Sequence, residues 1–108
     1  MNVQEMYSAF AESQAGRLTF PEVIRRSMAA GTESYFCDLA RGAEIFYGVD
    51  GETGMAPMTL PLEPVAVDYS AEGVAATIRA AQAYTIRYPE IVRRLRAAGV
   101  IAYWVYMT

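Results

Sequence analysis

The chain has 108 residues, of which 54% are hydrophobic, and a formal net charge of −3. That length allows one modest hydrophobic core and excludes two independent ones. All nine basic residues are arginines and histidine is absent, which excludes a Schiff-base lysine, an imidazole base and any histidine-containing metal site.

The remaining compositional features concern location and partners. Cys37 is the only cysteine, so no disulfide and no thiolate zinc site can form within one chain. Residues 1–10 do not resemble a signal peptide, and the longest apolar run, residues 100–107, is too short to cross a membrane. The negative net charge disfavours nucleic-acid binding. We therefore expect a cytoplasmic protein with no metal, cofactor, membrane or nucleic-acid partner.

Helix and strand signals follow one another along the chain. We predict a helix over 3–14, a second helix that starts at the capping box of Thr19 and ends at Gly31, a strand over 33–39 and a hairpin strand over 43–48. The three prolines between residues 55 and 67 allow at most an edge strand in the connector. After it we expect a helix over 71–83 capped by Ser70, a short helix ending at Gly99, and a strand over 100–107.

The sequence also repeats itself. A shift of 68 positions aligns residues 14–39 with 82–107, and ten of those 26 pairs are identical. Ordinary residue usage gives roughly two. The identical pairs include Pro21/Pro89, Glu22/Glu90, Arg25/Arg93, Arg26/Arg94, Gly31/Gly99 and Tyr35/Tyr103. The repetition predicts one domain, residues 1–108, built from repeat one at about 3–48, a connector at 49–69 and repeat two at about 70–108.

These elements predict an α+β fold. Two duplicated helix-helix-strand units would pack their helices on one face of a small antiparallel or mixed sheet. The second copy has arginine, Arg87, where the first has its capping threonine. It also has no return strand before the sequence ends, so a shortened second unit is compatible with the pattern.

The predicted hairpin has a three-residue loop that pairs Leu39 with Ala43. Counting back from there places Asp38 opposite Glu44 and Phe36 opposite Phe46. One face would then be apolar, with Cys37 among its inward residues as a small buried hydrophobe. The other face would combine aromatic and acidic side chains.

That second face is the candidate site. We predict a ligand-binding surface formed by Phe36, Phe46, Trp104, Tyr106 and Arg41. Asp38 and Glu44, if directly opposed, are weak candidates for acid–base catalysis because one of two repelling carboxylates would have a raised pKa. In the alternative interpretation the aromatic residues are ordinary packing, and Arg41 neutralises two solvated carboxylates.

Two functions remain open from these residues. The first is a non-enzymatic binding or assembly module that forms a homo-oligomer, a homodimer for example, through the unpaired edge strand near residues 100–107. The second is a small-ligand-binding protein or an enzyme that uses the face containing Asp38, Glu44, Phe36, Phe46 and Trp104.

One resemblance extends this interpretation. The segment from Phe20 to Arg26, then Ala30-Gly31, residues 38–42 and Tyr47-Gly48 resemble the bacterial domain-of-unknown-function family 1398, some of whose members are labelled phage envelope proteins. The segment from Ala80 to Tyr103 is also similar to it. The resemblance implies a small bacterial protein and supplies no activity, cofactor or catalytic residue.

Overall fold

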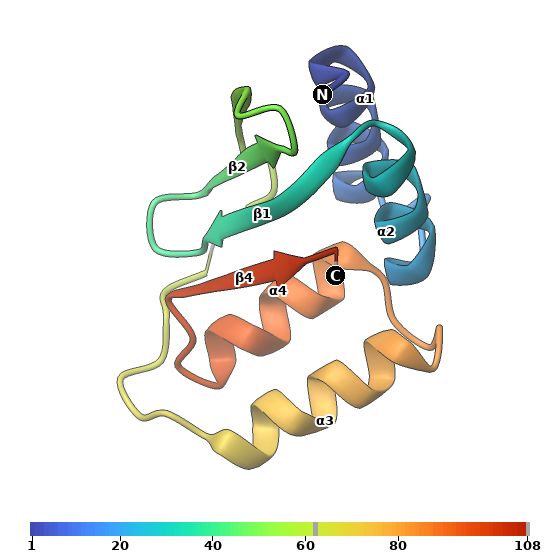
Figure 1. Ribbon diagram of the computed structural model, residues 1–108. Helices are drawn as coiled ribbons and strands as arrows, with labels where there is room; N and C mark the ends of the chain where they lie inside the picture. The colour runs from blue at the N-terminus through green and yellow to red at the C-terminus, as the bar shows by residue number, and fades with distance from the viewer. Residues whose placement is uncertain (62, 108) are drawn as a thin grey trace.

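The computed structural model describes residues 1–61 and 63–107. They form four helices and four strands in the order α1 (Val3–Gln14), α2 (Phe20–Ala29), β1 (Thr32–Asp38), β2 (Ala43–Gly48), β3 (Thr53–Pro57), α3 (Ala71–Gln82), α4 (Tyr88–Ala97) and β4 (Ala102–Tyr106) (Figure 1). Leu62 in the predicted connector and Thr108 at the predicted end of repeat two lie outside the described residues.

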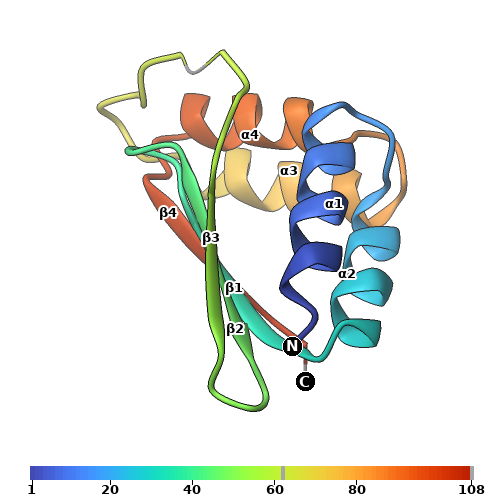
Figure 2. The same ribbon diagram turned by 90° about the horizontal axis from the view of Figure 1, so that it is seen from above.

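The strands form one antiparallel sheet in the order β3-β2-β1-β4. All four helices cover the same face of this sheet (Figure 2). We call this covered side the inner face, and the opposite side the outer face. The α+β class and the antiparallel option of the prediction are confirmed.

The helix ends follow the capping signals of the sequence. The Thr19 side chain accepts from the backbone N–H of Glu22 while the Glu22 carboxylate accepts from the Thr19 N–H, which completes the predicted capping box. Ser70 caps α3 as predicted. Arg87 occupies the equivalent position before α4 and makes no side-chain capping hydrogen bond.

The predicted register of the hairpin is wrong by one residue. Asp38, not Leu39, pairs with Ala43, and Glu44 lies opposite Cys37 instead of Asp38. The loop therefore contains four residues, 39–42. Asp38 determines this length, because its carboxylate accepts from the backbone N–H groups of residues 40 and 41 and its carbonyl accepts from the N–H of residue 42.

A one-residue slip exchanges the two faces of a strand. Glu44 and Phe46 consequently lie on the inner face, beside Tyr35 and Cys37 of β1, and not on the outer face where we had expected them. The residues that take their places on the outer face are Ile45 and Tyr47.

The core lies between the helices and the inner face. Phe10 of α1 makes edge-to-face contacts with Phe46, at a centroid distance of 6.1 Å, and with Tyr88, at 5.8 Å. Phe46 is fully buried. Burial of one such ring contributes about 2–3 kcal/mol. These contacts tie α1, β2 and α4 together.

The two edges of the sheet are β3 and β4. β3 ends at Pro57, in agreement with an edge strand as the most that the connector prolines allow. β4 occupies residues 102–106 of the predicted 100–107, and in the described chain only β1 pairs with it. Within residues 1–61 and 63–107, no helix has the length and apolarity required to span a membrane.

Candidate functional site

The predicted ligand-binding residues lie in three separate places. Phe36, Trp104 and Tyr106 share the outer face, where the Trp104 ring lies 4.9 Å from Phe36 and 5.8 Å from Tyr106. Phe46 lies on the inner face. Arg41 is exposed in the hairpin loop. The structure therefore does not assemble the predicted site.

The two predicted acid–base residues are also apart. Asp38 holds the hairpin loop through backbone N–H groups and is partly exposed. Glu44 is only 3% exposed and points toward the helices. The carboxylate pair was a consequence of the wrong register, and only Glu44 remains of chemical interest.

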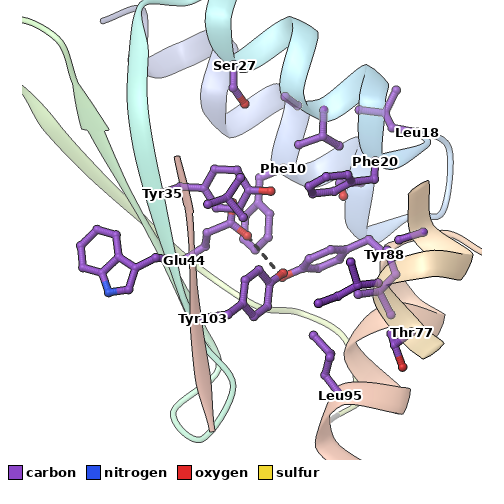
Figure 3. Close-up of a pocket in the computed structure, with 18 of the residues that line it drawn as sticks. Phe10, Leu18, Phe20, Ser27, Tyr35, Glu44, Thr77, Tyr88, Leu95 and Tyr103 are labelled. Carbon is purple, nitrogen blue, oxygen red and sulfur yellow. Dashed lines mark hydrogen bonds between the residues drawn. The ribbon is translucent and has the colours of Figure 1, made fainter. Parts of the chain in front are cut away.

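Glu44 faces a cavity of about 360 Å³ between the inner face and the helices. This volume is typical of a site for a small molecule. The walls are mostly apolar and come from both halves of the chain, with Met6, Phe10, Val23 and Tyr35 from the first half and Val74, Ala81, Tyr88, Ile91 and Tyr103 from the second. Figure 3 shows the Glu44 side chain reaching from the sheet into this space.

One hydrogen bond fixes the Glu44 carboxyl. The Tyr88 hydroxyl donates to Oε2 of Glu44 across 3.2 Å, drawn as the dashed line of Figure 3. The Sγ atom of Cys37 lies 3.2 Å from the same hydroxyl. If the thiol donates to the Tyr88 oxygen, both hydrogen bonds, from Cys37 to Tyr88 and from Tyr88 to Glu44, run toward the carboxyl group. Residues from β1, β2 and α4 therefore meet at one polar point in an apolar cavity.

Burial controls the ionisation of these groups. It raises the pKa of Glu44 to about 8, and the hydrogen bond from Tyr88 lowers that pKa by a smaller amount. Burial also raises the pKa of Cys37 to about 12 and the pKa values of Tyr35, Tyr88 and Tyr103 well above their usual value. Glu44 is thus mostly neutral at pH 7, and the thiol and the three phenols keep their protons.

Ser27 of α2 provides a second polar group in the cavity wall. Its hydroxyl is buried and, among the described residues, has no hydrogen-bond partner. A buried unpaired hydroxyl costs roughly 1–3 kcal/mol. It therefore remains available to a molecule that enters the cavity.

Metal binding has no support among the described residues, because no three His, Cys, Asp or Glu side chains come close enough together to hold an ion. The cavity wall contains one carboxyl group and no second acid. Neutral phenols and a protonated thiol are poor ligands for a divalent cation.

The sequence pattern around Glu44 is compatible with either orientation of β2. Glu44 and Phe46 alternate with Ile45 and Tyr47, so strand periodicity permits either pair to face inward. The loop length alone decided between the two, and that length depends on the hydrogen bonds of Asp38.

Comparison of the chain with protein-family models, with curated proteins and with solved structures found no match. The resemblance to domain-of-unknown-function family 1398 therefore stays a prediction.

Proposed function

We propose that this protein binds a small, mostly apolar molecule in the cavity, with the Glu44 carboxyl as the polar anchor. The observation that carries the proposal is a carboxyl group, 3% exposed, facing a cavity of about 360 Å³. Apolar walls with a few convergent polar groups are the usual composition of a ligand site. The raised pKa of Glu44 also supports a ligand site in this cavity, because strongly shifted pKa values are concentrated at functional sites.

A purely structural role explains Glu44 poorly. A carboxyl group is expensive to bury unless its hydrogen-bonding capacity is filled, and Glu44 receives one hydroxyl at 3.2 Å. An apolar side chain of similar size in the same place would stabilise the fold more. The energetic cost of burying the Glu44 carboxyl is explained if a ligand binds to it.

Binding is a better description than covalent catalysis. The pKa of Cys37, raised to about 12, keeps the thiol protonated and therefore a weak nucleophile. Among the described residues of the wall, Glu44 is the one group that can exchange a proton near neutral pH. An enzyme at this site would be limited to proton transfer on its bound ligand.

A fluorescent probe tests the proposal directly. Phenylnaphthylamine is neutral and apolar, and its emission rises when it leaves water for an apolar site. We expect saturable enhancement with one probe per chain. The enhancement should be lost in Ala81→Phe, because Ala81 is buried in the α3 wall and a phenyl group there fills the cavity.

The matched control is Met55→Ala on the outer face. Met55 is 64% exposed and does not line the cavity, so the enhancement should persist. Circular dichroism melting of both variants checks that they fold. Enhancement that survives Ala81→Phe in a folded variant, or that disappears in Met55→Ala, would place the probe elsewhere and contradict the proposal.

Self-association is a second candidate, favoured by the outer face and its edge. Met55 of β3 and Trp104 and Tyr106 of β4 are 64%, 46% and 64% exposed there, and one edge of β4 is unpaired in the described chain. An open aromatic edge of this kind is usually covered. Light scattering after size exclusion tests it: a dimer should dissociate in Trp104→Ala, and a strict monomer at micromolar concentration rejects the idea.

We also propose that the two halves arose by duplication of one helix-helix-strand unit. Matching elements have equal lengths, 12 residues for α1 and α3 and 10 for α2 and α4, and Gly31 and Gly99 share φ values of 83°. The cavity walls add support, since the 68-residue shift relates many lining residues in pairs: Met6/Val74, Ala9/Thr77, Phe10/Ile78, Ser13/Ala81, Phe20/Tyr88, Val23/Ile91, Ser27/Leu95 and Tyr35/Tyr103.

In this proposal the cavity lies between two related walls, and Glu44 of β2 adds the polar anchor.

A further inference from the structure

The charge of the cavity wall points to the charge of its ligand. Among the residues that the structure describes, Glu44 is the only acidic side chain in the wall, and no arginine lines it. An anionic ligand would lie beside a carboxyl group with no cation to balance it. The wall therefore disfavours anions and leaves neutral molecules and cations.

Aromatic rings surround the carboxyl group. Figure 3 shows Phe10, Tyr35, Tyr88 and Tyr103 around the end of the Glu44 side chain. The faces of such rings attract a positive charge, and desolvated pairs contribute about 2 kcal/mol or more. Aromatic rings that enclose a carboxylate, without a basic residue, form the chemical surroundings that bind ammonium groups.

We propose that the ligand is a small hydrophobic organic cation, an amine or quaternary ammonium compound, whose charged group lies against Glu44 and whose apolar part fills the cavity. This inference depends on the proposed function. The oxygen that contacts the cation is Oε1, since the hydrogen bond from Tyr88 goes to Oε2 and, within the described residues, no group donates to Oε1.

A neutral ligand would gain less binding free energy from Glu44 and the aromatic rings than a cation would. Amides and alcohols gain one ordinary hydrogen bond from the carboxyl, about 1 kcal/mol net. Hydrogen bonds between charged groups are worth about 1.5–3 kcal/mol, and the aromatic faces add to them. Bringing an ammonium ion out of water is expensive, and the carboxylate at the end of the cavity is what offsets that penalty.

Proton release follows from this pairing. The ionisable groups that interact with Glu44 are Cys37 and Tyr35 from β1, Tyr88 from α4 and Tyr103 from β4. Among the described residues, α1, α2 and α3 contribute no ionisable group to the wall. All four keep their protons at pH 7, so Glu44 alone responds. Its pKa of about 8 means that a bound cation drives off close to one proton at pH 7.

Three probes of one shape separate the possibilities: phenylbutylamine is cationic at pH 7, phenylbutanol is neutral and phenylbutyrate is anionic. Displacement of phenylnaphthylamine and calorimetry give their dissociation constants. We expect the amine to bind at least about tenfold more tightly than the alcohol, and the anion more weakly than either.

Glu44→Gln keeps the size of the side chain and removes its charge. In this variant the preference for the amine over phenylbutanol should fall below about threefold, because the amide can still hydrogen-bond an alcohol and has no charge to pair with the ammonium group. Calorimetry in two buffers of different ionisation enthalpy should detect proton release for the wild type with the amine, and none for Glu44→Gln.

The outcomes are distinct. If phenylbutanol binds as tightly as the amine, or if the preference for the amine survives Glu44→Gln, the proposal of a cationic ligand is wrong. The proposal of a ligand site in the cavity is unaffected by either result. If neither phenylnaphthylamine nor any of the three probes binds, both the cationic ligand and the proposed function are wrong. Amine preference that is lost in Glu44→Gln, together with proton release, supports the inference.

Discussion

The Tyr88 hydroxyl donates a hydrogen bond of 3.2 Å to Glu44, and the two residues are 44 positions apart in the sequence. The bond joins the first turn of α4 to the start of β2 and is buried in the core. It is a polar contact between the helical layer and the candidate ligand site. Its removal therefore affects both stability and ionisation.

For Tyr88→Phe we predict a loss of about 1 kcal/mol in the free energy of unfolding, because a buried hydrogen bond disappears while the ring stays. The pKa of Glu44 should rise further, since the hydroxyl stabilises the carboxylate. A carbon-detected NMR titration of the Glu44 carboxyl measures this pKa. The control is Tyr84→Phe at an exposed tyrosine. An unchanged Glu44 pKa in Tyr88→Phe would contradict the role of the hydroxyl.

Glu44 should make the protein less stable as pH rises. Its pKa is 4.5 in the unfolded chain and about 8 in the folded protein, so between these values the folded state holds a proton that the unfolded state has released. The contribution of Glu44 is fully present below pH 4.5 and is lost progressively up to about pH 8, a change on the order of a few kcal/mol.

Urea unfolding of wild type and Glu44→Gln from pH 5 to pH 9 measures this effect. We expect the wild type to lose stability relative to the variant across that range. Glu90 does not interfere, because its pKa is lowered to about 2 by Arg93 and its contribution changes only below pH 4.5. Parallel curves for the two proteins would show that Glu44 does not hold its proton in the fold.

Cys37 should be almost inert toward thiol reagents in the native protein. It is fully buried, and burial raises its pKa to about 12, so little thiolate exists at pH 8. We expect reaction with dithionitrobenzoate only after addition of denaturant. Val67→Cys in a Cys37→Ala background is the exposed control and should react at once. Rapid native labelling of Cys37 would indicate an opening of the sheet that the structure does not contain.

The capping box of α2 should contribute about 1 kcal/mol to the free energy of unfolding. Thr19→Ala removes the oxygen that accepts from the Glu22 N–H, and such replacements cost about 0.5–2 kcal/mol. Arg87→Ala is the matched change at the start of α4, where no side-chain cap exists, and should have a smaller effect. Equal losses in the two variants would show that the cap of α2 contributes nothing specific. Chemical denaturation of both proteins provides the comparison.

Local signals in the sequence predicted most of the fold. Asn2 caps α1 in the structure, Thr19 and Ser70 cap their helices as predicted, and glycines with positive φ end α2 and α4. These signals act over a few residues, and the helix bounds agree to within two residues. The fold class followed because helices and strands alternate in so short a chain.

The candidate site could not be predicted in the same way. The side that Glu44 faces depended on whether the loop before it contained three or four residues, which the carboxylate of Asp38 decided. The cavity itself requires Tyr88 and Tyr103 to reach the same point from the other half of the chain. Distances of this kind arise from packing and have no short-range pattern in the sequence.

In the proposed function, the shared walls of the cavity make the ligand a link between the two halves of the chain. A fragment that ends near Pro57 contains Glu44 and Tyr35 but lacks Tyr88 and Tyr103, so neither half holds a complete binding site. A molecule bound there touches both halves and stabilises the whole fold in proportion to the logarithm of its concentration. Loss of the ligand from a cell would thus lower the amount of intact protein as well as its occupancy, and proteolytic turnover would report the supply of the ligand.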